Sequence, residues 1–123
     1  MHLIDDPGAP PSPETDFDTF RKIDIRLGTV RAAAPLEGAR KPSITLEIDF
    51  GPGVGVKQSA AQITEHYACD ALIGRRVMAV VNFPPRRIAG FKSECLTLGV
   101  ADASGAITLI APDHDAPDGA RLA

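Results

Sequence analysis

The sequence predicts an all-β fold, a five-stranded barrel with short helices. Apolar and polar residues alternate with a period of two over several short segments, which is the pattern of half-buried strands. Glycine and proline, 11 of each, separate these segments. The 123 residues fit one domain, and 44% apolar side chains suffice for a core that must be largely aliphatic, because aromatic residues make up only 5%.

The N-terminal region predicts a disordered or loosely docked arm followed by a short helix. Residues 1–15 include the run DDPGAPPSP, which is rich in proline and acid. Thr15 and the acid three residues later resemble a capping box, so a helix should carry Phe17 and Phe20 on one face. We place the domain at residues 16–123 and expect the two rings to pack on the barrel end or on a second subunit.

The first two strands are predicted from their alternation. Residues 23–30 alternate apolar and charged side chains, and the phase slips at Gly28, which indicates a β-bulge. After a loop over residues 36–42, residues 43–50 alternate cleanly. The side chains predicted to face inward from this second strand are Ile44, Leu46, Ile48 and Phe50.

The middle of the chain predicts a turn, a short strand, a helix and a buried strand. Residues 51–55 form the turn, and residues 56–58 pair back onto the preceding strand. Residues 59–67 predict a short helix, because they begin with a capping-box pattern and place Ile63 on an apolar face. Residues 77–83 are nearly all apolar, which favours a strand covered on both faces.

The C-terminal part predicts the remaining strands. Leu96, Leu98 and Val100 alternate with other residues, and a turn at 102–105 separates them from a second alternating run at 107–109. The order places one helix between the third and fourth of five antiparallel strands, which is the order of the OB fold, a partly open barrel. We therefore predict an OB-fold barrel with an N-terminal helix and a C-terminal extension.

Charge is distributed unevenly along the chain. The net charge is −3, but residues 1–20 hold five acids and no base, whereas residues 21–112 hold 12 bases and 8 acids, a formal +4. A mildly basic body permits a polyanionic partner without requiring one. The acidic arm is a candidate to fold over this body and compete with polyanions.

Several features predict a cytoplasmic protein. No apolar run approaches the roughly 20 residues of a membrane-spanning helix. The N-terminus lacks the basic and apolar regions of a secretory signal, so we expect no membrane insertion. Cys69 and Cys95 are isolated, which favours reduced thiols over the alternative of a single disulfide between them.

No pattern typical of an enzyme, a metal site or a cofactor is present. The glycine-rich run at 51–57 resembles a phosphate-binding loop, but Val56 and Gln58 stand where that loop requires glycine and Ser or Thr. The three histidines are far apart in the sequence. The two cysteines suit buried thiols better than nucleophiles. We therefore predict a binding protein that needs no cofactor.

The most informative segment, residues 75–92, holds five bases and no acid. These bases are Arg75, Arg76, Arg86, Arg87 and Lys92. Two consecutive prolines end the preceding strand and stiffen the loop, so they hold Arg86 and Arg87 outside the sheet. Adjacent arginines on such a loop suit phosphate or carboxylate recognition. The alternative is a solvated loop with local salt bridges to Glu94 or Asp49.

Two motifs resemble those of a known family. Lys57–Thr64 reads KQSAAQIT, and Val80–Gly99 reads VVNFPPRRIAGFKSECLTLG. On these motifs the chain is similar to CsaA, the bacterial protein-export chaperones, from about Asp16 to its end. CsaA belongs to the tRNA-binding-domain group of OB folds, found also as appendages on methionyl- and phenylalanyl-tRNA synthetases. Shorter matches are DIRLGTV (Asp24–Val30), LEIDFG (Leu46–Gly51) and PDG (Pro117–Gly119).

The resemblance implies a homodimer whose terminal segments supply much of the interface, which would bury Phe17 and Phe20. It also implies a protein that holds export precursors unfolded and binds peptides in grooves near that interface. In the tRNA-binding relatives, the loop matching residues 86–96 contacts RNA, with a serine at the place of Ser93. Synthetase-type domains commonly read Ser-x-Gly-Met there, whereas this chain reads Ser-Glu-Cys-Leu, which places it with CsaA.

Two binding hypotheses follow, and a dimeric interaction module with neither activity is the third. A peptide-binding chaperone would use Phe50, Ile63, Phe83, Arg86 and Arg87. A binder of structured RNA such as tRNA would track phosphates with Lys57, Arg75, Arg76, Arg86, Arg87, Lys92 and Ser93. One tyrosine and five phenylalanines leave few rings for base stacking, because the core needs them as well.

Overall fold

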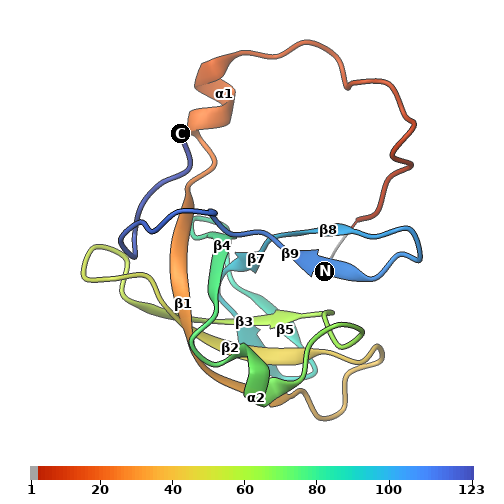
Figure 1. Cartoon of the computed structure of the whole chain (residues 1–123), viewed down its shortest axis with the longest axis vertical. Helices are drawn as coiled ribbons and strands as arrows, with labels where there is room; N and C mark the ends of the chain where they lie inside the picture. Colours follow the sequence, from red (N-terminus) through yellow and green to blue (C-terminus); the bar gives the residue numbers. More distant parts are fainter. Residues whose placement is uncertain (1–2) are drawn as a thin grey trace.

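A computed structural model describes residues 3–123 of the chain and contains a five-stranded antiparallel sheet in the order β3-β2-β1-β4-β7 (Figure 1). Its strands are β1 (Ile25–Pro35), β2 (Ile44–Asp49), β3 (Val56–Ala61), β4 (Arg76–Val80) and β7 (Leu96–Thr97). A short helix, α2 (Cys69–Leu72), lies between β3 and β4 in the chain. This is the predicted OB-fold order, which the structure confirms.

The barrel closes between β3 and the chain segment that precedes β7. The backbone N–H of Glu94 donates to the carbonyl of Gln58 at 2.8 Å, and the Glu94 carboxylate accepts from the Gln58 N–H at 3.1 Å. The N–H of Ala60 donates to the Ser93 hydroxyl at 3.1 Å. The KQSA motif is therefore the closing seam of the barrel.

Two hairpins and one further helix complete the described chain. The hairpins are β5 (Arg86–Ile88) with β6 (Phe91–Ser93), and β8 (Gly99–Ala101) with β9 (Ile107–Leu109). The helix α1 (Phe17–Arg21) stands at one end of the barrel beside the C-terminus, and α2 covers the other end (Figure 1). None of the helices in residues 3–123 is long and apolar enough to cross a membrane.

The core is aliphatic, as predicted, and centres on β2. Its side chains Ile44, Leu46, Ile48 and Phe50 are all at most 3% exposed. Gly28 on β1 packs directly against this strand, since a Cβ atom there would lie 2.6 Å from Ile48 and 2.7 Å from Phe50. Glycine is required at this position for close approach, and the bulge predicted there is wrong: the register with β2 shifts between Val30 and Ala32 instead.

The C-terminal segment is bonded along β1. The Leu27 N–H donates to the Ala120 carbonyl at 2.9 Å, the Gly119 N–H donates to the Leu27 carbonyl at 2.8 Å, and the Leu122 N–H donates to the Ile25 carbonyl at 2.8 Å. These bonds pin the predicted C-terminal extension to the barrel.

Two local sequence patterns do not match the structure, because tertiary contacts override them. The helix predicted over 59–67 is wrong: β3 continues through Ala61, and Ser59 donates to the Cys95 carbonyl at 3.0 Å instead of capping a helix. The alternation noted at 96–100 does not correspond to alternating burial of its apolar side chains. Thr97 is 1% exposed and Val100 is 57% exposed, because the Thr97 hydroxyl donates to Ser59 at 2.9 Å and so tolerates burial.

The predicted N-terminal helix is confirmed as α1, with its cap one residue later than expected. The Asp16 carboxylate accepts from the Thr19 N–H at 2.8 Å and from its hydroxyl at 2.7 Å, and these bonds lower the pKa of Asp16. None of the α1 residues is buried. Residues 3–16 of the arm form no helix or strand, and residues 1–2 of the predicted arm lie outside the described residues.

Candidate binding surface

The β5–β6 hairpin presents the arginine pair that the sequence singled out. Ile88 pairs with Phe91 across Ala89 and Gly90, whose φ angles of 50° and 81° fit a tight turn of the type that favours hairpins. The residues on either side of this turn form strands where a loop was predicted. Arg86 and Arg87 are exposed on this hairpin.

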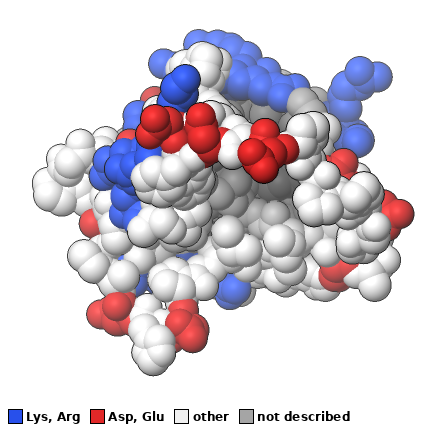
Figure 2. Space-filling view, turned by 90° about the horizontal axis from the view of Figure 1, so that it is seen from above, with Lys and Arg blue, Asp and Glu red and all other residues white. Residues whose placement is uncertain are grey.

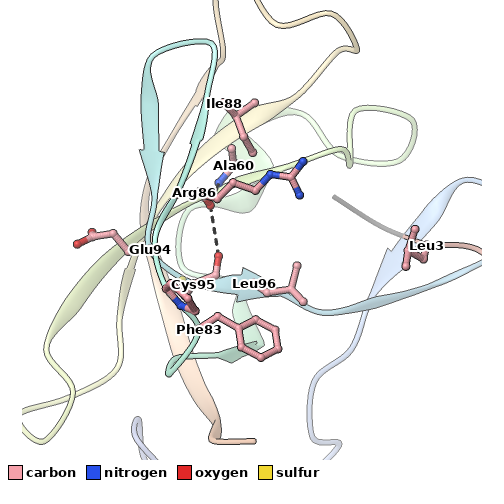
Figure 3. A pocket seen from close by; sticks show the side chains of 10 residues that line it. Leu3, Ala60, Phe83, Arg86, Ile88, Glu94, Cys95 and Leu96 are labelled. Carbon is pink, nitrogen blue, oxygen red and sulfur yellow. Dashed lines mark hydrogen bonds between the residues drawn. The ribbon is translucent and has the colours of Figure 1, made fainter.

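An apolar groove lies beside the hairpin. It has a volume of about 240 Å³, and its wall includes Phe83, Ile88 and Leu96, with Arg86 among the side chains that line it (Figure 3). Phe83 is 43% exposed, which is unusual for a phenylalanine next to a core. We call this feature the hairpin groove. An apolar wall beside a guanidinium suits a polypeptide segment, which offers both apolar side chains and carbonyl or carboxylate oxygens.

The two acids named in the alternative interpretation, Glu94 and Asp49, accept hydrogen bonds from backbone N–H groups. Glu94 points away from Arg86 in Figure 3 and accepts from the Gln58 N–H. Asp49 accepts from the Gly51 N–H at 2.8 Å. Arg87 donates to the Gly90 carbonyl at 3.1 Å, a bond within its own hairpin. The guanidinium pair therefore stays at the surface of the hairpin.

The floor of the groove is a buried polar network. The hydroxyls of Ser59 and Ser93 both donate to the Cys95 carbonyl, at 3.0 and 3.4 Å. Burial raises the pKa of the Cys95 thiol to about 12, so this thiol is not a nucleophile. Cys69 and Cys95 are both free cysteines in the structure. Ser93 is 8% exposed, so its hydroxyl has a structural role in place of the predicted RNA contact.

A second concavity, the loop recess, joins the hairpin to the β1–β2 loop. It has a volume of about 850 Å³ and is lined by Arg40 and Lys41 from that loop and by Arg86 from the hairpin. Figure 2 looks onto the end that carries α1 and shows Lys and Arg gathered along one edge of this face, with acids beside them. Sequence reasoning missed Arg40 and Lys41. The signal was available, because these two OB-fold loops flank the ligand face.

Two predicted peptide-binding residues are wrong. Phe50 and Ile63 are both 0% exposed and belong to the barrel core, so neither can contact a ligand. The sequence correctly predicted that Phe50 faces inward. A side chain that fills the core cannot also line a surface groove. Of the apolar candidates, Phe83 alone lies in the hairpin groove.

The predicted bases do not form one surface. Arg76 donates to Asp115 at 3.2 Å, to Asp118 at 3.0 Å and to the Ala116 carbonyl at 2.7 Å, so it clamps the C-terminal segment. Arg75 lies over the ring of Tyr67, 5.0 Å from its centroid. These two arginines are therefore engaged within the chain, and Lys57 is half-buried at the start of β3. Arg86, Arg87 and Lys92 share the hairpin.

A third feature involves the two chain ends and is called the terminal surface. Phe17 on α1 is 69% exposed and lies 5.9 Å from Phe20, measured between ring centroids. An apolar recess of about 340 Å³, lined by Leu27, Met78 and Leu122 among others, lies at the C-terminal segment. Arg121 ties the two ends together by donating to the Arg21 carbonyl at 2.6 Å.

The barrel order and the groove beside its basic hairpin define an OB-fold binding protein. Among residues 3–123, no cluster of three or more His, Cys, Asp and Glu side chains could hold a metal ion. Residues 25–121 match the family model described as a putative tRNA binding domain. The chain belongs to this family, and within it to the CsaA type.

Solved structures of CsaA chaperones are similar to the chain over their whole length. The CsaA chaperone of Bacillus anthracis is 47% identical with a TM-score of 0.84, and the similarity covers 90% of this chain and 100% of that one. The CsaA chaperone of Picrophilus torridus is 43% identical with a TM-score of 0.82, over 89% of this chain and 100% of that one.

Curated relatives include much longer enzymes. The methionine–tRNA ligase of Porphyromonas gingivalis is 32% identical over 114 residues, which are 93% of this chain and 16% of the ligase. That of Flavobacterium johnsoniae is 34% identical over 106 residues, which are 86% of this chain and 14% of the ligase. The chain therefore spans about one-sixth of the length of these relatives.

Proposed function

We propose that this protein is a homodimeric chaperone that binds unfolded polypeptide segments in the hairpin groove and performs no catalysis. The observation that carries the proposal is Phe83, a phenylalanine 43% exposed in an apolar groove that Arg86 also lines. The ring offers shape-tolerant apolar contact, and the guanidinium offers hydrogen bonds to backbone carbonyls or carboxylates. The similarity to CsaA chaperones supports the same function.

The size of the groove limits the apolar surface that a client can bury, and this area limits the affinity. A client that buries a few hundred Å² of apolar surface gains several kcal/mol at about 25 cal/mol per Å², and ordering an extended segment offsets part of this gain. A remainder of about 4 kcal/mol corresponds to roughly millimolar affinity for a single groove. Weak binding with rapid exchange suits a protein that holds a client unfolded and then releases it.

The dimer in this proposal forms through the terminal surface. A helix as short as α1 is not stable by itself, and its rings at Phe17 and Phe20 need cover. Two grooves per dimer would raise the avidity for a long unfolded chain. Light scattering on a Phe17→Ser/Phe20→Ser variant should give the mass of a monomer where the parent chain gives that of a dimer. A monomeric parent chain would remove the dimer from the proposal.

A test of the chaperone function compares two exposed apolar residues. Phe83→Ser removes the ring from the groove, and Ile73→Ser changes a side chain that is 57% exposed in the turn after α2. Aggregation of chemically denatured citrate synthase is followed by light scattering at one dimer per client. The parent chain and Ile73→Ser should slow aggregation alike, and Phe83→Ser should slow it several-fold less. No effect of the parent chain on this or other denatured clients defeats the proposal.

RNA binding is the second candidate, and the loop recess is the observation that favours it. Arg40, Lys41 and Arg86 line one concavity between the two loops that flank the ligand face of OB folds. The match to a putative tRNA binding domain supports this candidate. Neutralisation of about four phosphates would make log affinity for tRNA fall with log salt at a slope near −3 to −4. A flat salt response removes the candidate.

A further inference from the structure

Leu3, the first described residue of the N-terminal arm, lies at the binding surface. Leu3 lines the hairpin groove with Phe83 and Arg86, and it also lines the loop recess. Figure 3 shows Leu3 across the groove from Cys95, on the side toward which Arg86 points. Leu3, Ile4, Asp5 and Pro7 also line a recess against the β8–β9 hairpin. The arm precedes the family match at 25–121, so the barrel itself does not require this contact.

The rest of the arm has the form of a tether. After Asp6 the chain turns tightly, because the Asp6 carboxylate accepts from the Gly8 N–H at 2.8 Å and its carbonyl accepts from the Ala9 N–H at 2.9 Å. Figure 1 shows the following segment arching clear of the barrel until it reaches α1. The far end is fixed, since Asn82 donates to the Lys22 carbonyl at 2.8 Å. The segment before the turn is thus held near the groove but not locked into it.

The composition of this segment complements the groove and the loop recess, both of which Leu3 lines. Leu3 and Ile4 are aliphatic and are followed by Asp5 and Asp6, and the first 20 residues hold five acids and no base. The groove has an apolar wall, and the adjoining recess is lined by bases. Leu3 is 87% exposed and Ile4 is 56% exposed, so the contact is loose. A loose contact is what a ligand displaced by a client requires.

We propose that the segment Leu3–Asp6 is a tethered ligand of the hairpin groove, which competes with clients and shows the ligand class that the groove prefers. That class is an extended segment with aliphatic side chains directly followed by carboxylates. The inference rests on the proposed function only in that clients use the same groove. A short flexible tether gives an effective concentration near 1 mM, so an intrinsic dissociation constant of about 1 mM weakens client binding about twofold and one of 0.1 mM about tenfold.

The test uses the full chain with substitutions in the arm. Leu3→Ser/Ile4→Ser removes the aliphatic pair, Asp5→Asn/Asp6→Asn removes the charges, and Ile73→Ser is a control of similar exposure outside the arm and the groove. The first probe is fluorescein-labelled, reduced and carboxymethylated α-lactalbumin, followed by fluorescence polarisation. The two arm variants should bind it twofold to tenfold more tightly than the parent chain, and the control should bind it as the parent does.

The second probe tests the segment in isolation. A labelled peptide with the sequence of residues 3–8 should bind Leu3→Ser/Ile4→Ser, and adding Phe83→Ser should abolish this binding. Unchanged lactalbumin affinity in both arm variants, together with no binding of the peptide, overturns the inference and leaves the chaperone function intact. Binding of the peptide without any binding of lactalbumin supports the inference, because the groove then binds this segment. The same result contradicts the proposed chaperone function.

Discussion

Two consecutive arginine pairs, Arg75–Arg76 and Arg86–Arg87, lie ten residues apart in one acid-free segment, yet the fold uses them in opposite ways. Arg76 is held by two carboxylates and a carbonyl of the C-terminal segment. Arg86 and Arg87 are exposed on the β5–β6 hairpin, where Glu94 points away from Arg86 (Figure 3) and Arg87 donates to the Gly90 carbonyl. The comparison shows that tertiary contacts, and not the local sequence, decide whether an arginine of such a pair stabilises the fold or lies exposed at the surface.

The largest expected effect comes from the engaged pair. Arg76→Ala leaves the Asp118 carboxylate without the guanidinium that it meets at 3.0 Å, next to the Thr29 hydroxyl that donates to it at 2.8 Å. The side chain of Arg76 is 29% exposed, so part of the ion pairing is screened by solvent. We expect a loss of about 2 kcal/mol in the free energy of unfolding, because a partly desolvated carboxylate loses its partner.

Urea unfolding followed by circular dichroism measures this loss. Arg87→Ala is the matched control, because its exposed side chain, within residues 3–123, donates only to a carbonyl of its own hairpin turn, and it should change stability by no more than about 0.5 kcal/mol. Equal losses for the two variants would show that the distinction between engaged and exposed arginines is wrong.

The second effect comes from the exposed pair and is a change in binding. Arg86→Ala/Arg87→Ala should lower tRNA affinity about tenfold and make the salt slope shallower by about two, if each arginine neutralises one phosphate. Lys22→Ala/Arg31→Ala removes the same charge from other exposed positions and controls for the net charge of the chain. A filter-binding series at several salt concentrations measures both quantities. Identical slopes for the two double variants would exclude the hairpin from the RNA interface.

Sequence patterns predicted the barrel well wherever one face of a strand is buried. In β2 the alternation from Ile44 to Phe50 matched the burial, because a shift by one residue would expose the whole apolar set. In β3 and β7 the pattern misled, because Ser59 and Thr97 are buried polar residues that satisfy each other with a hydrogen bond. No single-strand pattern reveals such a pair, since its members lie far apart in the sequence.

The candidate site was only partly predictable for a related reason. The prolines before Arg86 correctly predicted that Arg86 and Arg87 lie outside the main sheet, since they are a local signal, but the residues around them form a hairpin where a loop was predicted. Arg76 is engaged because it donates to Asp115 and Asp118, which lie some 40 residues away in the sequence. No local pattern connects these residues. Arg40 and Lys41 were missed because they join Arg86 only after the barrel closes. Side chains that meet across the fold are the part that needed the structure.

The smallest expected effect is on the free energy of unfolding and concerns a third arginine, Arg26. It shows whether the ion pair of Arg26 with Asp24 stabilises the fold. Arg26 donates to Asp24 from two nitrogens, at 2.6 and 3.2 Å, and this pairing lowers the pKa of the Asp24 carboxyl below its ordinary value of 3.8. A lowered pKa in the folded state means that the carboxylate adds stability above about pH 5, and that this contribution disappears as the pH falls through 3.8 toward the folded-state pKa.

We expect this contribution to be at most about 1 kcal/mol, since both side chains keep contact with water. Urea unfolding at pH 7 and pH 3 measures it as the difference between the parent chain and Asp24→Asn. The two proteins should differ most at pH 7, and the difference should shrink at pH 3, because that pH lies below the ordinary pKa of 3.8 and the Asp24 carboxyl of the unfolded parent is then largely protonated. A difference that stays constant across this range would mean that Asp24 acts through its hydrogen bonds alone, and that charge does not distinguish the engaged arginines from the exposed pair.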